Sequence, residues 1–130
     1  MAADPTALLH SIFGFPGFRP GQEEIVNAVL AGRNTLAIMP TGGGKSLCFQ
    51  LPALLLDGVT IVVSPLISLM KDQVDALVQN GINAALINSS QTAAENAAVI
   101  DAVKRGQVTL LYVAPERLAL SYFMDVLHQL

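Results

Sequence analysis

The feature that most constrains the fold is an alternation of short β-prone runs with helical patterns. The runs are rich in Leu, Ile and Val, and they cover residues 35–39, 59–64, 84–88 and 109–114. The first, second and fourth lack strict alternation of apolar and polar residues, which is typical of strands buried on both faces. Strands that alternate with helices indicate βαβ units, so we predict an α/β fold with a parallel sheet of about four strands, flanked by helices.

Helical periodicity fills the intervals between the runs. Three of the predicted helices end at a glycine, namely Gly32, Gly81 and Gly106. Thr92 and Glu95 have the spacing of a capping box, which predicts a helix start at this position. We expect a last helix over 118–130. The sequence contains no linker composition and no internal repeat, so we interpret the 130 residues as one domain at most.

Composition excludes several classes of protein. With 52% apolar and 13% charged residues, the chain is not intrinsically disordered. Its strongly apolar stretches are interrupted by proline and too short to span a membrane, and the first basic residue, Arg19, comes too late for a secretory signal. The single Cys48 excludes an intrachain disulfide and a cysteine-based zinc site. We therefore expect a cytoplasmic protein.

The charge balance limits how nucleic acid can be bound. The net charge is -3, whereas a protein that neutralises many phosphates usually has a basic excess. Any nucleic acid must therefore be held by backbone amides and a few local side chains.

A glycine-rich loop follows the first β-prone run and precedes a helical stretch. Its sequence is Pro40-Thr41-Gly42-Gly43-Gly44-Lys45-Ser46. Glycines allow successive backbone N–H groups to turn toward phosphate oxygens, and the helix start adds partial positive charge. Lys45 is expected to reach the β- and γ-phosphates, and Ser46 to ligate Mg²⁺. Met39 departs from the pattern G-x-x-x-x-G-K-[ST], and the alternative is a glycine-rich turn with a solvated lysine.

A segment with three aromatic residues lies before the first amphipathic helix. It runs Phe13-Gly14-Phe15-Pro16-Gly17-Phe18-Arg19-Pro20-Gly21-Gln22. A primary amide can donate to N7 of adenine and accept from its N6–H, while an aromatic ring can stack on the base. The alternative is an aromatic cluster that packs the N-terminal segment on the sheet.

Taken together, these residues resemble the N-terminal part of a RecQ-family DNA helicase, in helicase superfamily 2. Motif zero, L-x-x-x-F-G-x-x-x-F-R-x-x-Q, is met at 9–22, and motif I, M-P-T-G-G-G-K-S, at 39–46, where the family has Met39. Motif Ia, S-P-L-I-S-L-M-K-D-Q, stands at 64–73, and the A-P-E-R-L segment (motif Ib) at 114–118. Four motifs in order make the resemblance specific from about Leu9 to Leu118.

The resemblance implies an ATP-dependent helicase that moves 3′ to 5′ on single-stranded DNA and acts in repair and recombination. Its fold would be that of a P-loop NTPase, RecA-like, and its cofactors ATP and Mg²⁺. Phe15 would stack on adenine, Arg19 and Gln22 would bind it, and the loop with Lys45 and Ser46 would hold phosphate and metal. The residues implied on the side that binds single-stranded and duplex-junction DNA are Ser64, Pro65, Lys71, Pro115, Glu116 and Arg117.

Two of the implied DNA contacts have plainer alternatives. Lys71 can lie on a solvated helix face beside Asp72 and Asp75, and Glu116 can form a local ion pair with Arg117.

The family also has parts that these residues do not contain. They are an acidic D-E-x-H segment, a second RecA-like domain with an arginine finger, and zinc-binding and winged-helix regions. We interpret 1–130 as the N-terminal part of the first RecA-like domain of a nucleoid-associated helicase, and we expect these residues alone neither to hydrolyse ATP nor to unwind DNA. The alternatives are a non-catalytic nucleotide-binding module and a small-molecule P-loop kinase, which would lack motifs zero and Ia.

Overall fold

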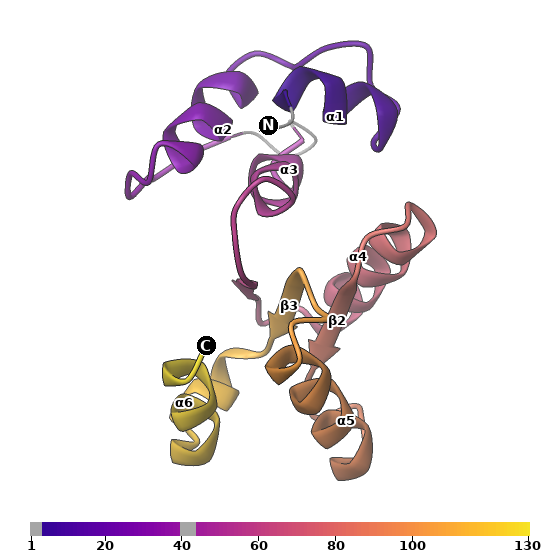
Figure 1. Cartoon of the computed structure of the whole chain (residues 1–130), viewed down its shortest axis with the longest axis vertical. Coiled ribbons are helices and arrows are strands. Elements are labelled where there is room, and N and C mark those ends of the chain that lie inside the picture. Colours follow the sequence, from indigo (N-terminus) through magenta and orange to yellow (C-terminus); the bar gives the residue numbers. More distant parts are fainter. Residues whose placement is uncertain (1–3, 40–43) are drawn as a thin grey trace. The chain divides into compact units, whose positions relative to one another are not determined.

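The structure is a computed structural model that describes residues 4–39 and 44–130. The chain divides into two compact units, an N-terminal unit of Met1–Asp57 and a C-terminal unit of Gly58–Leu130 (Figure 1). The sequence gives no sign of this division, because no proline-, glycine- or serine-rich linker separates the two units. Each unit has its own hydrophobic core and is described by itself.

The N-terminal unit is a group of three short helices, α1 (Pro5–Ser11), α2 (Gln22–Leu30) and α3 (Leu47–Ala53). Its core consists of four buried side chains, Leu9, Val26, Leu47 and Leu51. Phe13 and Phe18 pack against this core, whereas Phe15 is 46% exposed. The aromatic segment therefore serves two purposes, because two of its rings fill the core and the third remains accessible to a ligand.

The run 35–39, which we expected to be a strand, is not one. It has no regular secondary structure, and the side chains of Leu36 and Ile38 are 90% and 91% exposed. A strand exists only through hydrogen bonds to a neighbouring strand, and no described residue pairs with this run. Its apolar composition is typical of a strand, but composition alone does not determine whether a neighbouring strand is present to pair with it.

The C-terminal unit contains the sheet. Its strands are β1 (Thr60–Val63), β2 (Ala84–Ile87) and β3 (Leu110–Val113), and their order is β1-β3-β2. Both pairings are parallel, with Leu110 opposite Thr60 on one side and Ala84 on the other. Three of the four predicted strands are confirmed within one residue at each end.

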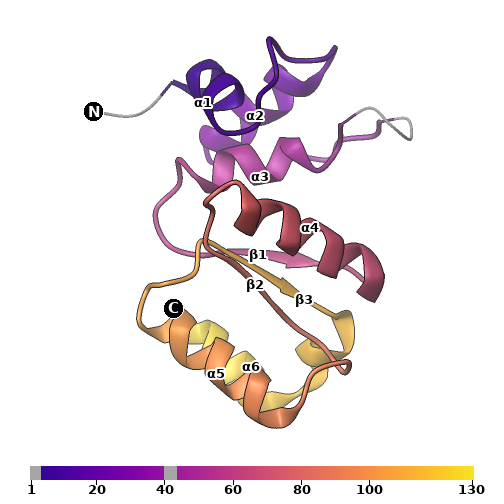
Figure 2. The same ribbon diagram turned by 90° about the vertical axis from the view of Figure 1, so that its right-hand side faces the viewer.

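Helices cover both faces of this sheet. Figure 2 shows α4 (Ile67–Gln79) on one face and α5 (Ala93–Lys104) and α6 (Ser121–His128) on the other. All four residues of the central strand β3 are buried, and Leu111 and Val113 share a core with Phe123 of α6. The predicted α/β class, a small parallel sheet flanked by helices, is confirmed, with three strands among the described residues.

Local signals define most helix ends. Helix α4 ends as predicted before Gly81, whose φ of 81° suits glycine, and the N–H groups of Gly81 and Ile82 bond back to Val78 and Leu77. The expected helix over 118–130 is shorter than predicted, because a 3₁₀ turn, η1 (Pro115–Ala119), precedes α6.

The predicted capping box at the start of α5 is present. Glu95 Oε1 accepts from the Thr92 N–H at 3.0 Å, and Thr92 Oγ1 accepts from the Glu95 N–H at 3.1 Å. Hydrogen bonds to the Glu95 carboxylate, first from the Thr92 backbone and then from the Thr92 side chain, hold the pKa of Glu95 below its ordinary value. The capping box therefore fixes the start of the helix that follows β2.

Replacement of Thr92 by Ala is expected to destabilise the chain by about 1 kcal/mol, because the Glu95 N–H loses its acceptor. Urea unfolding followed by circular dichroism measures the change. Thr92→Ser, which keeps the hydroxyl, is the control and should remain close to wild type. Equal stability of all three proteins would contradict the prediction that the Thr92 hydroxyl stabilises the helix start.

Candidate functional site

The side chain of Gln22 connects motif zero with the end of the glycine-rich loop. Gln22 is the first residue of α2 and only 3% exposed. Its Oε1 accepts from the Arg19 backbone N–H at 2.7 Å, and its Nε2 donates to the Gly44 carbonyl at 3.0 Å. The structure thus brings together two sequence segments that we predicted to share one nucleotide.

Gly44 leaves room for this contact because it has no side chain. Its φ is 77°, a left-handed conformation that favours glycine, and a Cβ at this position would overlap Gln22 Nε2. The neighbouring Thr41, Gly42 and Gly43, also predicted to hold phosphate, lie outside the described residues.

Lys45 and Ser46 follow at the start of α3. Lys45 is exposed, and Ser46 occupies the N-cap position without a side-chain capping bond. An ammonium group and a hydroxyl beside a left-handed glycine at a helix start fit a triphosphate with Mg²⁺. Cys48, the second residue of α3, is buried, and burial raises the pKa of its thiol.

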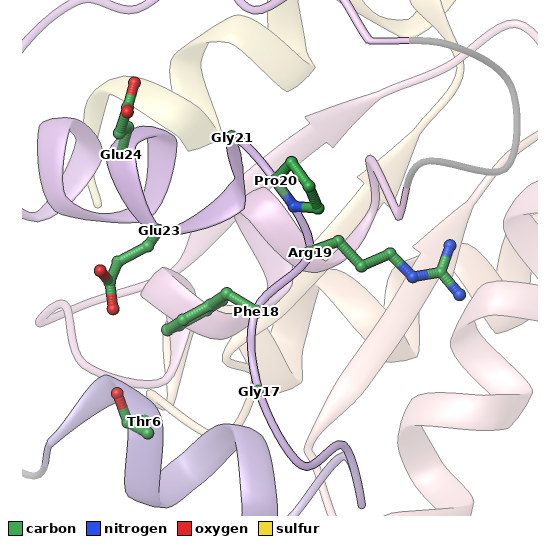
Figure 3. Close-up of a pocket in the computed structure, with 8 residues that line it drawn as sticks. All are labelled: Thr6, Gly17, Phe18, Arg19, Pro20, Gly21, Glu23 and Glu24. Carbon is green, nitrogen blue, oxygen red and sulfur yellow. The ribbon is translucent and has the colours of Figure 1, made fainter.

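A pocket of about 530 Å³ lies on the same unit and shares Arg19 with the predicted nucleotide-binding residues. Its lining residues are Thr6, Gly17, Phe18, Arg19, Pro20, Gly21, Glu23 and Glu24. Figure 3 shows Thr6, Phe18 and Glu23 on one side, while the Arg19 guanidinium extends in the opposite direction. Neither Phe15 nor Gln22 lines it, and two carboxylates make it unsuited to phosphate. It therefore overlaps the predicted nucleotide site at Arg19, whose guanidinium extends away from the other labelled side chains.

In the C-terminal unit, parallel pairing brings the predicted DNA-side residues to one edge of the sheet. Ser64 follows β1, and its N–H donates to the carbonyl of Val113, the last residue of β3, at 3.1 Å. Ser64 Oγ accepts from the Leu66 N–H at 3.2 Å, so it shapes the turn into α4. Pro65 is exposed, and Pro115 and Glu116 are exposed at the start of η1. Ligands of open α/β sheets bind at such carboxyl ends.

Arg117 belongs to a polar cluster that we did not predict from the sequence. Its Nη2 donates to the Asn88 carbonyl at 3.5 Å and its Nη1 to the Tyr122 hydroxyl at 3.0 Å, so it does not pair with Glu116. Asn88, directly after β2, is fully buried, and its Nδ2 has no hydrogen-bond partner. A buried donor without an acceptor is costly and needs an explanation.

A pocket of about 280 Å³ lies next to this cluster. Its lining residues are Ser89, Gln91, Ala93, Asn96, Ala97, Ile100, Arg117 and Tyr122. One guanidinium, several neutral polar groups and no carboxylate line it, which suits an anion. The signal in the sequence was the polar run Asn88-Ser89-Ser90-Gln91 after a predicted strand, at the edge where ligands bind.

The structure places Lys71 on a solvated helix face, which is the plainer of the two alternatives for this residue. Its Nζ lies 2.8 Å from Asp75 Oδ2 on the exposed face of α4, and both side chains are more than half exposed. The hydrogen bond and charge of Asp75 raise the pKa of Lys71 above its ordinary value. Lys71 is thus a cation that a phosphate has to share with Asp75.

Comparison with known proteins identifies the class to which this fold and loop belong. The DEAD/DEAH box helicase family model matches residues 19–129, so the chain belongs to that family. Within it, the resemblance to RecQ helicases is confirmed. The chain is 54% identical to the ATP-dependent DNA helicase RecQ of Haemophilus influenzae over 95% of its own length and 20% of the relative.

Two further relatives show how widely the similarity extends. The chain is 53% identical to the ATP-dependent DNA helicase RecQ of Bacillus subtilis over 93% of this chain and 21% of the relative. It is 47% identical to the ATP-dependent helicase SGS1 of Saccharomyces cerevisiae over 87% of this chain and 8% of the relative. The chain thus spans about a fifth of the length of the RecQ relatives.

None of the helices over 4–39 and 44–130 is long and apolar enough to cross a membrane. In the same ranges, no three His, Cys, Asp or Glu side chains are grouped so that they could hold a metal ion.

Replacement of Asp75 by Asn is expected to lower the pKa of Lys71 toward its ordinary value, because the partner that favours the charged amine is lost. An NMR titration of the Lys71 side chain measures the shift. Asp101→Asn is a matched control, since Asp101 pairs with Arg105 at the same distance of 2.8 Å on α5. An unchanged Lys71 pKa in Asp75→Asn would show that the ion pair does not form in solution.

Proposed function

We propose that these residues form the N-terminal part of the first RecA-like domain of an ATP-dependent 3′-to-5′ DNA helicase of RecQ type. The observation that supports this most strongly is the bridge from Gln22 to Gly44, because it joins the candidate adenine reader to the phosphate loop. The names of the relatives, ATP-dependent DNA helicases, support the same activity for the longer protein.

The N-terminal unit supplies the nucleotide contacts in this proposal. The exposed ring of Phe15 stacks on adenine, and Arg19 and Gln22 bind the base. Lys45 holds the β- and γ-phosphates, and the Ser46 hydroxyl is a ligand for Mg²⁺. The metal, when bound, neutralises charge that develops on the phosphates.

The C-terminal unit supplies part of the DNA-binding face. Ser64, Pro65, Pro115 and Glu116 lie at the carboxyl ends of β1 and β3, and Lys71 lies on the helix that follows β1. We assign a backbone phosphate to the pocket beside Arg117, where the guanidinium provides donors. A few local donors of this kind are compatible with a net charge of -3.

Hydrolysis requires groups that other parts of the longer protein provide. In the family these are the D-E-x-H segment, which holds magnesium and polarises the attacking water, and an arginine finger worth about 10³ to 10⁵ in rate. We therefore infer that the 130 residues bind nucleotide without turnover and that the full-length protein acts in the cytoplasm on nucleoid DNA. Any zinc site of such a helicase would belong to regions that these 130 residues do not contain.

The full-length protein that carries this chain is expected to unwind a duplex with a 3′ single-stranded tail when ATP and Mg²⁺ are present. Lys45→Ala should abolish unwinding and phosphate release, because the β- and γ-phosphates lose their cation. Fluorescent strand displacement and phosphate release measure the two activities.

Two controls accompany this experiment. A duplex with a 5′ tail should not be unwound, and the 130-residue chain alone should release no phosphate. If the 130 residues release phosphate steadily, and Lys45→Ala abolishes this release, the proposal that hydrolysis requires other parts of the longer protein is contradicted. Nucleotide binding by a full-length protein that neither hydrolyses nor unwinds would favour the alternative, a non-catalytic nucleotide-binding module.

Arg117→Ala in the full-length protein is expected to weaken binding of single-stranded DNA. The slope of the logarithm of the association constant against the logarithm of the salt concentration should fall in magnitude by about 1, the value for one lost phosphate contact. Arg105→Ala is the matched control, because Arg105 is an exposed arginine whose partner is Asp101 on the far part of α5. Fluorescence anisotropy with labelled oligonucleotides at several salt concentrations measures both. Equal slopes for the two variants would exclude a phosphate contact at Arg117.

A further inference from the structure

We propose that the pocket beside Arg117 holds one whole nucleotide of single-stranded DNA, with its base stacked on the ring of Tyr122 and its phosphate at the guanidinium. Tyr122 then adds a base contact to the phosphate contact of Arg117. This inference rests on the proposed DNA-binding face and deepens it, because Tyr122 lies outside all four motifs of the sequence.

The walls of the pocket suit a flat ligand. The pocket is lined by residues after β2 and by α5 and α6, which cover the same face of the sheet (Figure 2). Ala93, Ala97 and Ile100 line it from α5, at a spacing that places them on one side of this helix. Tyr122 lines it from α6. A nucleobase has two flat faces, so it fits a pocket with a low apolar wall and an aromatic ring.

Tyr122 and Phe123 are neighbours on α6 and have different surroundings. Phe123 is fully buried and belongs to the core, whereas Tyr122 is 52% exposed. The Tyr122 hydroxyl accepts from Arg117 Nη1 at 3.0 Å, so the ring is held beside the guanidinium while half of the residue remains open to solvent. A ring that is tied at one end loses little conformational freedom when a base covers its face.

The guanidinium of Arg117 keeps donors for a phosphate. It has five N–H groups, and its bonds to Tyr122 and Asn88 use two of them. The Asn88 carbonyl also accepts from the Gln91 N–H at 3.4 Å and from Asn96 Nδ2 at 3.2 Å. Three donors thus meet two lone pairs, and the contact from Arg117 is the longest at 3.5 Å. A phosphate can take over this N–H at little cost, because the carbonyl keeps its two closer donors.

The size and polarity of the pocket indicate one nucleotide of a single strand. Its volume is about 280 Å³, slightly below the roughly 300 Å³ at which pockets for drug-sized ligands begin. None of its lining residues is a carboxylate, so a phosphate meets no like charge there. A base can lie on the Tyr122 ring only when it is unstacked from its neighbours, which favours single-stranded DNA over a duplex.

The test measures binding of two labelled single strands to the full-length protein by fluorescence anisotropy. One strand is an oligothymidylate, and the other has the same length but an abasic site at every position. Tyr122→Leu should bind the oligothymidylate about tenfold more weakly than wild type and the abasic strand like wild type, because only the stacking contact is lost. Tyr122→Phe, which keeps the ring, should remain close to wild type on both strands.

A second variant tests the same pocket from α5. Ala97→Leu places a larger side chain in the pocket, and it should weaken binding of the oligothymidylate. Ala97 is exposed and Leu is a good helix former, so the fold is retained. Ala98→Leu is the matched control, because Ala98 is also exposed on α5 and does not line the pocket, and it should bind like wild type.

Different failures overturn different claims. The stacking contact is refuted if Tyr122→Leu binds the oligothymidylate like wild type, if it loses as much affinity for the abasic strand, or if Tyr122→Phe loses as much as Tyr122→Leu. If Arg117→Ala still weakens binding of both strands, the proposed function stands with the phosphate contact alone. A full-length protein that binds neither strand would refute the proposed DNA-binding face and, with it, the nucleotide pocket.

Discussion

The parallel pairing of β1 and β2 with the buried strand β3 is the constraint on which the C-terminal unit depends. Because all three strands run in the same direction, the turns after them meet at one edge of the sheet. Ser64 and Asn88, which are 24 positions apart in the sequence, each follow a strand that is paired with β3. The candidate DNA-binding face is thus a product of strand direction and helix capping rather than of overall charge.

The N-terminal unit depends on a different interaction, the buried amide of Gln22. Three short helices have a small core, and the segment between α2 and α3 includes the exposed run 35–39. The Gln22 amide fixes both the turn at Arg19 and the carbonyl of Gly44, which are far apart in the sequence. A single side chain thereby holds the carbonyl at the end of the glycine-rich loop.

Local signals could be predicted from the sequence, and contacts between distant residues could not. Three of the four predicted strands, the capping box at Thr92 and the glycine that ends α4 follow from patterns within a few residues, and these are confirmed. The run 35–39 has the composition of a strand but no described partner, and strand pairing cannot be inferred from one run alone. The cluster at Asn88 was missed because its members come from separate elements.

Much of the candidate site could be predicted because its motifs are continuous in the sequence. Motif zero and the glycine-rich loop identified Gln22 and Lys45, but only the three-dimensional structure shows that Gln22 contacts the loop itself. The helix α1 was not predicted, although Asp4 caps it and Pro5 begins it, since its seven residues are too few for a periodic pattern.

The central claim is that this chain is the first part of an ATP-dependent DNA helicase. The coding DNA beyond the codon for Leu130 tests it most directly. The account predicts an open reading frame in which the next β-prone run is followed by Asp-Glu-x-His, the acidic segment that the phosphate loop requires for hydrolysis. A stop codon at this point, confirmed in the transcript, would contradict the claim and leave a nucleotide-binding module without catalysis.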